Sequence, residues 1–285
     1  MATNALDFDK IKQLSQLPEA GAGRNFATDF PSVKDQVSPE EWQARVDLAA
    51  CYRLVDLYDM TYLIYNHITV RVPGTDQFLI NLYGLTYKEI TASSLVKIDI
   101  DGEIVWKPET DYGINKPGYV IHGCIHRARP EVSCVIHTHT RAGMAVASMK
   151  CGLLPLTQTS MRFVGHIGYH DYEGPATRLE ERERLVSNLG PHDAMILRSH
   201  GLLTCGATVA QAFNTMYQLE LSCRGQADAM AARTELLIPD KEILEHTAKM
   251  YQPGTRRPYG ILEWPAMLRL LEAEGKHSGY PPYWQ

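Results

Sequence analysis

Apolar residues recur along the chain with two periods, that of an amphipathic helix and that of a buried strand. Trp42, Val46, Ala49 and Leu54 follow helical spacing, which predicts a helix from residue 39 to about residue 58, with Ser38 as its N-cap. Further helices are predicted over residues 120–129, 142–149, 178–189, 208–232 and 264–275, with a short one near residues 8–14.

Short β-rich runs bounded by turn residues predict the strands. They cover residues 68–72, 77–81, 96–100, 104–106, 132–138, 194–198 and 201–205, and one more strand is expected near residues 163–165. Strands are too numerous for a regular alternation of strand and helix, so we expect an α/β protein with a central mixed sheet flanked by helices. The pattern divides the chain into an N-terminal arm (1–38), a main domain (39–238) and a C-terminal extension (239–285).

Composition narrows the class of protein. The chain has 285 residues, 45% of them hydrophobic and 21% charged, as in ordinary globular proteins. A net charge of -5 argues against a nucleic-acid surface, and no apolar run approaches the ~20 residues of a membrane span. The six cysteines are scattered, several within apolar runs, and no signal pattern begins the chain. We therefore expect buried free thiols in a cytoplasmic protein.

Two histidines follow the predicted strand over residues 132–138. His137 and His139 are two residues apart, so on a strand their side chains point to the same face. A second apolar run delivers His200 directly before Gly201. Three imidazoles at strand ends suit a divalent metal with positions left open for substrate, although the spacing alone does not show that His200 meets the other two.

An ordered set of motifs resembles the class II aldolase/adducin family. It extends over roughly residues 40 to 235 and comprises Tyr65-Asn66-His67-Ile68-Thr69-Val70-Arg71, Tyr83-Gly84, Ile90-Thr91-Ala92-Ser93-Ser94-Leu95-Val96, Ala128-Arg129-Pro130-Glu131, Val135-Ile136-His137-Thr138-His139, Tyr169-His170-Asp171-Tyr172 and Arg198-Ser199-His200-Gly201. The sequences of these motifs resemble those of the adducin branch and its bacterial relatives most. The resemblance implies a three-layer α/β/α sandwich with a largely antiparallel mixed sheet, and a homotetramer with its active site at a subunit boundary. It also implies that His137, His139 and His200 bind one divalent metal ion, which could be zinc, iron or manganese.

One position departs from the sugar-phosphate aldolases that the chain resembles. Their Ser-Ser-Glu motif falls on Lys116-Pro117-Gly118 here, so the two serines that contact phosphate and the glutamate that carries a proton are all replaced. A phosphorylated substrate would lose two hydrogen-bond donors, and the usual acid/base would be absent. We therefore expect a small substrate without a phosphate group.

Other side chains are candidates to replace these groups. Tyr119, His122 and His170 are candidate proton carriers. Asn66, Tyr83, Lys116 and Arg141 are candidate substrate-binding residues; the resemblance places Asn66 at a strand entry and Tyr83 in a loop around the site. A structural role in a turn, a packed loop or an ion pair is the alternative for these residues.

Three functions compete. The first is a lyase that breaks a carbon–carbon bond next to an oxygen held by the metal, by retro-aldol cleavage or decarboxylation of a small oxo- or hydroxy-acid. The second is a non-haem Fe(II) oxygenase acting on an aryl-2-oxo or 2-hydroxy acid, as in relatives from aminocoumarin antibiotic pathways. The third is a non-catalytic assembly module like adducin, against which the complete histidine trio argues. The expected partners are a small-molecule substrate and further copies of the chain, with neither nucleic acid nor membrane.

Overall fold

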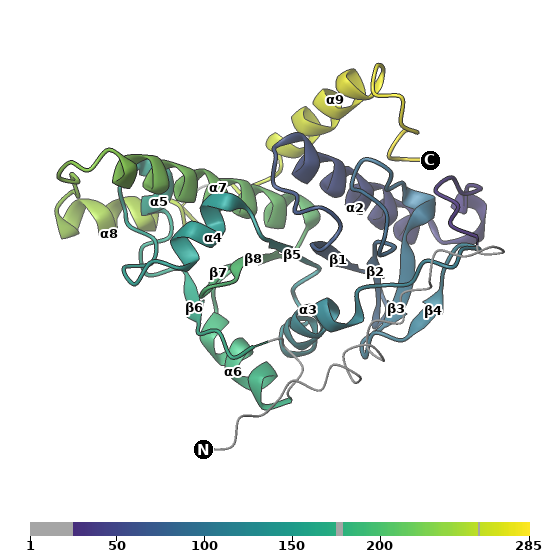
Figure 1. Cartoon of the computed structure of the whole chain (residues 1–285), viewed down its shortest axis with the longest axis horizontal. Helices are drawn as coiled ribbons and strands as arrows, with labels where there is room; N and C mark the ends of the chain where they lie inside the picture. Colours follow the sequence, from purple (N-terminus) through teal and green to yellow (C-terminus); the bar gives the residue numbers. More distant parts are fainter. Residues whose placement is uncertain (1–24, 175–178, 256) are drawn as a thin grey trace.

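The computed structural model describes residues 25–174, 179–255 and 257–285. Its strands form one eight-stranded sheet in the order β4-β3-β2-β1-β5-β8-β7-β6 (Figure 1). The strands are β1 (His67–Arg71), β2 (Gln77–Ile80), β3 (Val96–Asp99), β4 (Ile104–Trp106), β5 (Cys134–Thr138), β6 (Gly168–His170), β7 (Ala194–Leu197) and β8 (Gly201–Gly206). Six of the seven neighbouring pairs are antiparallel, and β6 and β7 are parallel. The prediction of a mixed, largely antiparallel sheet is confirmed.

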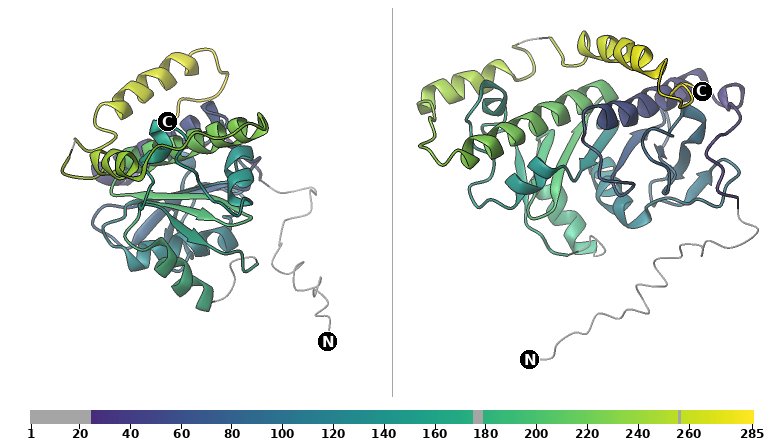
Figure 2. Two further views of the ribbon diagram at one scale, coloured as in Figure 1. Left: turned by 90° about the vertical axis from the view of Figure 1, so that its left-hand side faces the viewer. Right: turned by 45° about the horizontal axis from the view of Figure 1, so that its top comes forward.

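Helices cover both faces of the sheet, which makes the three layers of the predicted sandwich (Figures 1 and 2). On one face lie α2 (Pro39–Leu57), α4 (Arg141–Ala147) and α7 (Val209–Ala231), and on the other lie α3 (Lys116–Ala128) and α6 (Leu179–Leu189). The short elements η1 (Lys34–Gln36), η2 (Ala92–Ser94) and α5 (Gln158–Met161) lie in the connections, and α8 (Lys241–Met250) and α9 (Glu263–Gly275) lie outside α7 and α2.

The alternation of strand residues explains the two cores. In β5, Ile136 belongs to the larger cluster beneath α2 and α7, whereas Val135 belongs to the smaller cluster beneath α3 and α6. Strand β7 behaves in the same way, with Ile196 on the first face and Met195 on the second. Apolar residues at consecutive positions in β5, β7 and β8 are thus buried on both faces, which is why their sequences read as continuous apolar runs.

Two helix caps are where the sequence predicted them, and a third cap makes α3 longer than predicted. The side chains of Ser38 and Thr208 accept hydrogen bonds from backbone amides in the first turns of α2 and α7, as predicted. Helix α3 begins four residues earlier than predicted, because the Asn115 side chain accepts a hydrogen bond from the Gly118 amide. Gly118 is therefore in the first turn of a helix.

The expected strand near residues 163–165 is wrong. Thr157 and Ser160 form a capping box that starts α5, the chain then turns through Gly165 with a φ of +72°, and the strand is β6. Helix α8 was not predicted. Leu244, Thr247 and Ala248 are its less exposed positions and share one face at helical spacing, whereas Ile243 and Met250 are about half exposed.

Residues of the predicted arm and extension pack on the domain. Phe30 and Val33 are buried, whereas the short helix expected near residues 8–14 lies outside the described residues. In the extension, the Trp264 indole donates to Asp47 of α2, and the carbonyl of Gln285 accepts from the Ser93 amide.

All six cysteines are free, and burial raises the pKa of the thiols of Cys51, Cys134, Cys205 and Cys223. Cys151 is exposed. Across the described parts of the chain, no helix combines the length and the apolar character needed to cross a bilayer.

A buried ion pair fastens α2 to the turn η2. The fully buried Arg45 guanidinium pairs with Glu41 at 3.0 Å and donates to the carbonyls of Ala92 and Leu95. We expect Arg45→Ala to lower the free energy of unfolding by about 3 kcal/mol, because two buried carbonyls lose their donor and the Glu41 carboxylate keeps its 3.0 Å pair with Lys97 but loses Arg45. Urea unfolding measures the loss. The matched control is Arg127→Ala, which breaks an exposed pair with Asp101 and should cost less than about 1 kcal/mol; equal losses in the two variants would contradict the role of Arg45.

Candidate metal centre

The three histidines of the sequence prediction converge because of the way β5, β7 and β8 are joined. Strand β5 runs antiparallel to β8, with Thr138 opposite Leu202, so the end of β5 lies beside the start of β8. The turn between β7 and β8 carries His200. It is tight: Ser199 has a φ of +54°, and a Cβ on Gly201 would lie 2.3 Å from the carbonyl oxygen of Thr138. Glycine is therefore required where β8 approaches β5.

The geometry of the trio fits a metal ion. Ring centroids are 4.6 Å apart for His137–His139 and His139–His200 and 4.8 Å apart for His137–His200. Potential ligand atoms of the three residues lie within 4.8 Å of one another, and Nε2 of His137 is 2.8 Å from Nε2 of His139. Nδ1 of His137 donates to the carbonyl of Leu202 at 2.8 Å, which leaves the Nε2 lone pair for a metal. Such a backbone partner is usual for a metal-binding histidine.

Electrostatics also favours a cation at this place. Burial, joined by the neighbouring imidazoles, lowers the pKa of His137 well below its usual value and that of His200 to about 4, and burial lowers the pKa of His139. The rings are therefore neutral at pH 7, and neutral imidazole is the form that binds metal. Three uncharged nitrogen donors would leave the full charge of a bound divalent ion available to polarise a substrate oxygen.

The residue after the histidine pair anchors it to helix α7. Thr140 accepts a hydrogen bond from the Gly143 amide as the N-cap of α4, and its hydroxyl donates to Glu220. Burial raises the pKa of Glu220, which also accepts from Arg224 at 2.7 Å. The segment that carries His139 is thereby fixed between a strand end and two helices.

A second row of buried polar groups lies behind the trio. His67, the first residue of β1, is paired in register with His137, and the rings of the two residues are 5.9 Å apart. The ring of His122 lies 4.2 Å from that of His67, and Thr69 Oγ1 lies 2.8 Å from both His122 Nδ1 and His126 Nε2. Burial lowers the pKa of His67 to about 4 and that of His126 to about 3, so this row is neutral at pH 7.

The candidate proton carriers have different surroundings. His122 is fully buried in the row just described. His170, on β6, has Nδ1 3.0 Å from the amide nitrogen of Asn188 and Nε2 3.8 Å from Glu181. Tyr119 is directed at strand β3, where its hydroxyl donates to the carbonyls of Asp99 and Ile100, and burial raises its pKa. The structure thus places His122 and His170 in the layer around the trio and directs the Tyr119 hydroxyl elsewhere.

The candidate substrate-binding residues are also spread. Asn66 is 1% exposed, and neither polar atom of its side chain has a partner among the described residues. Tyr83 is half-buried and close to Tyr65, so burial and Tyr65 raise its pKa. Lys116 pairs with Glu103 at the surface, and Arg141 is exposed at the first position of α4.

Exposed aromatic and apolar side chains form a rim around the trio. Tyr62 lies 5.6 Å from the ring of His139 and Tyr172 lies 6.2 Å from that of His200, and the two are 44% and 56% exposed. Leu63 and Tyr65 beside them are 71% and 46% exposed. The hollow beside His200 has a volume of only about 10 Å³, against ~300–1,000 Å³ for typical ligand sites. The described residues that line this hollow leave too little room for a substrate there.

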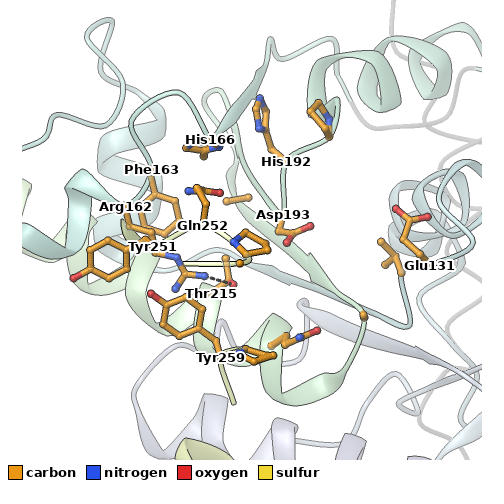
Figure 3. A pocket seen from close by; sticks show the side chains of 18 of the residues that line it. Glu131, Arg162, Phe163, His166, His192, Asp193, Thr215, Tyr251, Gln252 and Tyr259 are labelled. Carbon is orange, nitrogen blue, oxygen red and sulfur yellow. Dashed lines mark hydrogen bonds between the residues drawn. The ribbon is translucent and has the colours of Figure 1, made fainter. Parts of the chain in front are cut away.

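A larger cavity of about 450 Å³ lies where β5 and β7 begin, at the other end of those strands from His137 (Figure 3). Its Arg162 guanidinium donates to Asn214 and Thr215 and stacks 4.1 Å from the centre of the Tyr259 ring. His192 and Asp193 line the same cavity. It contains none of the three candidate ligands and is a separate feature.

The geometry defines a candidate divalent-metal site of three histidines at the strand ends of an α/β/α sandwich. The sequence matches the family described as Class II Aldolase and Adducin N-terminal domain over residues 46–227, and the chain belongs to this family.

Three relatives illustrate the range of the family. A crystal structure of an aldolase II superfamily protein from Pseudomonas syringae has 47% identity and a TM-score of 0.84, covering 90% of this chain and all of that one. L-fuculose 1-phosphate aldolase from Glaciozyma antarctica has 26% identity and a TM-score of 0.73, covering 87% and 94%. Alpha-adducin from Rattus norvegicus is 40% identical over 253 residues, which are 83% of this chain but 34% of the adducin.

Sequence reasoning singled out Gly118 only as the position that replaces a glutamate, and it missed His67 as a neighbour of the candidate site. The signal was present, since His67, Thr69 and Arg71 alternate with the apolar Ile68 and Val70 and so mark a polar face on a strand. What the sequence does not give is the register that sets His67 opposite His137.

The ligand assignment predicts the effect of removing one imidazole. We expect His200→Ala to lose tight binding of one equivalent of Zn(II), whereas its free energy of unfolding without metal stays within about 1 kcal/mol of the wild type, because its side chain lies in a turn outside the apolar clusters. Metal analysis after dialysis and urea unfolding in chelator check this. His192→Ala is the control and should retain zinc; unchanged metal content in His200→Ala would refute the assignment.

Proposed function

We propose that the protein is a metal-dependent lyase that cleaves a carbon–carbon bond in a small, non-phosphorylated oxo- or hydroxy-acid. The observation that carries the proposal is the convergence of His137, His139 and His200, with neutral rings and a rim open to solvent. Membership of the class II aldolase family supports this reaction class, and likeness to an L-fuculose 1-phosphate aldolase supports carbon–carbon cleavage.

The three imidazoles would hold the metal, whose charge would polarise a substrate oxygen when bound. His170 could bond a substrate group beside His200, since both residues line the same hollow. Lys116 is paired with Glu103 and position 118 is glycine, so the groups that would bind phosphate and carry a proton in a sugar-phosphate aldolase are absent at these positions. The proposed substrate therefore lacks a phosphate group.

A second candidate is an Fe(II) oxygenase acting on an aryl-2-oxo or 2-hydroxy acid. The donor set favours it: three neutral imidazoles, with no carboxylate among the grouped ligands of the described residues, leave room for both substrate and dioxygen. The aromatic rim of Tyr62, Tyr65 and Tyr172 is suited to an aryl group. A third reading, an adducin-like assembly role without turnover, is supported by the 40% identity to alpha-adducin.

We also propose that the active site is completed by a second subunit in a cytoplasmic homo-oligomer, as a tetramer would allow. The exposed Leu63, Tyr65 and Tyr172 border a hollow too small for a substrate, and a neighbouring chain would cover these side chains and enclose the site.

Metal replacement separates the candidates. Protein stripped of metal is loaded anaerobically with Zn(II), Mn(II) or Fe(II) and given 4-hydroxy-2-oxopentanoate or 4-hydroxyphenylpyruvate. A lyase is expected to release pyruvate and acetaldehyde from the first compound without oxygen, in the zinc or manganese form, and His139→Ala is expected to lower the rate by at least about a hundredfold. Oxygen uptake with the second compound, confined to the iron form, would favour the oxygenase instead. Metal binding without turnover of either class of acid would favour the assembly role.

A further inference from the structure

The imidazole of His67 is a buried polar group next to the candidate metal centre. Its register places it directly opposite His137, and residues directly opposite one another project from the same face of the sheet. The residue is 2% exposed, and neither ring nitrogen makes a hydrogen bond of normal length and angle with the described residues. The backbone groups of Gly118 and Tyr65 are near enough to offset part of the lowering of the His67 pKa by burial. Buried polar groups nearly always make well-formed hydrogen bonds, so an imidazole that lacks them beside the trio points to a ligand that binds there.

Gly118 makes room for this ring. A Cβ at position 118 would lie 2.5 Å from Cε1 and 3.0 Å from Nδ1 of His67. The glycine has little freedom to retreat, because its amide donates to the Asn115 side chain that caps α3. His67 thus occupies the space that any side chain at position 118 would require.

The row behind His67 fixes the ring on its other side. His126 donates from Nδ1 to the carbonyl of Val132 at 3.3 Å, so its Nε2 accepts from the Thr69 hydroxyl. The Thr69 oxygen in turn accepts from Nδ1 of His122, whose ring packs 4.2 Å from His67. Because a carbonyl can only accept, the direction of each bond follows. His67 is therefore confined between an oriented His122 and the backbone of Gly118.

We propose that His67 is a specificity-determining residue that hydrogen-bonds an oxygen of the small hydroxy- or oxo-acid held at the His137, His139 and His200 centre. The inference rests on the proposed function for the metal and for the class of ligand. It adds a fourth imidazole, which belongs to β1, and a reason for glycine at position 118. Thr69 is a positioning residue, which acts through His122.

The test uses Co(II) as the metal and glycolate as the probe, read by visible absorption of the protein rather than by turnover. Wild type, His67→Ala, Gly118→Ala and the double variant are each loaded with one equivalent of Co(II) and titrated with glycolate. Both single variants are expected to bind Co(II) with an unchanged spectrum and to bind glycolate about tenfold more weakly, the effect of one lost hydrogen bond to a charged group. The double variant is expected to be no weaker than His67→Ala, since position 118 acts only by displacing that ring.

His192→Ala is the matched control and should bind glycolate as the wild type does, because this residue lines the separate cavity. If His67→Ala does not fold, Gly118→Ala carries the test, since it displaces the ring and keeps every imidazole. Unchanged glycolate binding in the single variants overturns the proposal, and so does loss of Co(II) from His67→Ala, which would make the residue a metal ligand. A wild-type protein that binds no Co(II) overturns the proposed function itself, whereas one that binds Co(II) but not glycolate overturns only the class of ligand.

Discussion

The register of three neighbouring strands, β1, β5 and β8, is the constraint on which the site depends. His67 is paired with His137, and His137 with Leu203, while the carbonyl of Leu202 holds Nδ1 of His137. Side chains on a strand alternate between faces, so a slip of one residue would turn the imidazole of His137 into the opposite core. The apolar residues on both faces of β5 oppose such a slip, because it would exchange members of two differently shaped clusters. The packing of apolar side chains on both faces of β5 thus sets the direction of the candidate ligand His137.

Several buried histidines with neutral imidazoles lie at one end of this sheet. Burial lowers the pKa of His67, His122, His126 and His137, which keeps each ring uncharged while backbone carbonyls and Thr69 satisfy some of the nitrogens. Buried neutral imidazoles have few water molecules to bond, and they can bind a cation and an anionic ligand that enter the site together. The exposed rim of Tyr62, Leu63 and Tyr172 has the same character at the protein surface, since it too is unfavourable until something covers it. Both the buried imidazoles and the exposed rim are therefore expected to lower the stability of the chain without ligand.

The sequence predicted the sandwich from local patterns, and the ordered motifs implied that the three candidate metal ligands meet. The spacing of His137 and His139 fixes their common face, and the apolar runs around His200 fix the strands beside it. It did not reach contacts between distant segments. Tyr119 has the right chemistry for a proton carrier, but helix α3 turns its hydroxyl toward the carbonyls of β3. Lys116 is paired with Glu103, which directly precedes β4. The expected strand near residues 163–165 failed for a local reason, because Thr157 and Ser160 start α5 and the chain then turns through Gly165. Sequence reasoning missed His67 because only the pairing of β1 with β5 places it opposite His137.

The hydrogen bond from His137 to Leu202 joins residues 65 positions apart, and this separation bears on how the protein acquires its metal. An unfolded chain already contains the local pair of His137 and His139, but the third nitrogen arrives only when the β7–β8 hairpin docks on β5. Strand pairings of such long range form slowly, since the loop must close before the contacts compensate. The affinity for a metal ion would therefore be low early in folding and high at the end. Release of the ion from the folded protein would require at least local opening of that hairpin.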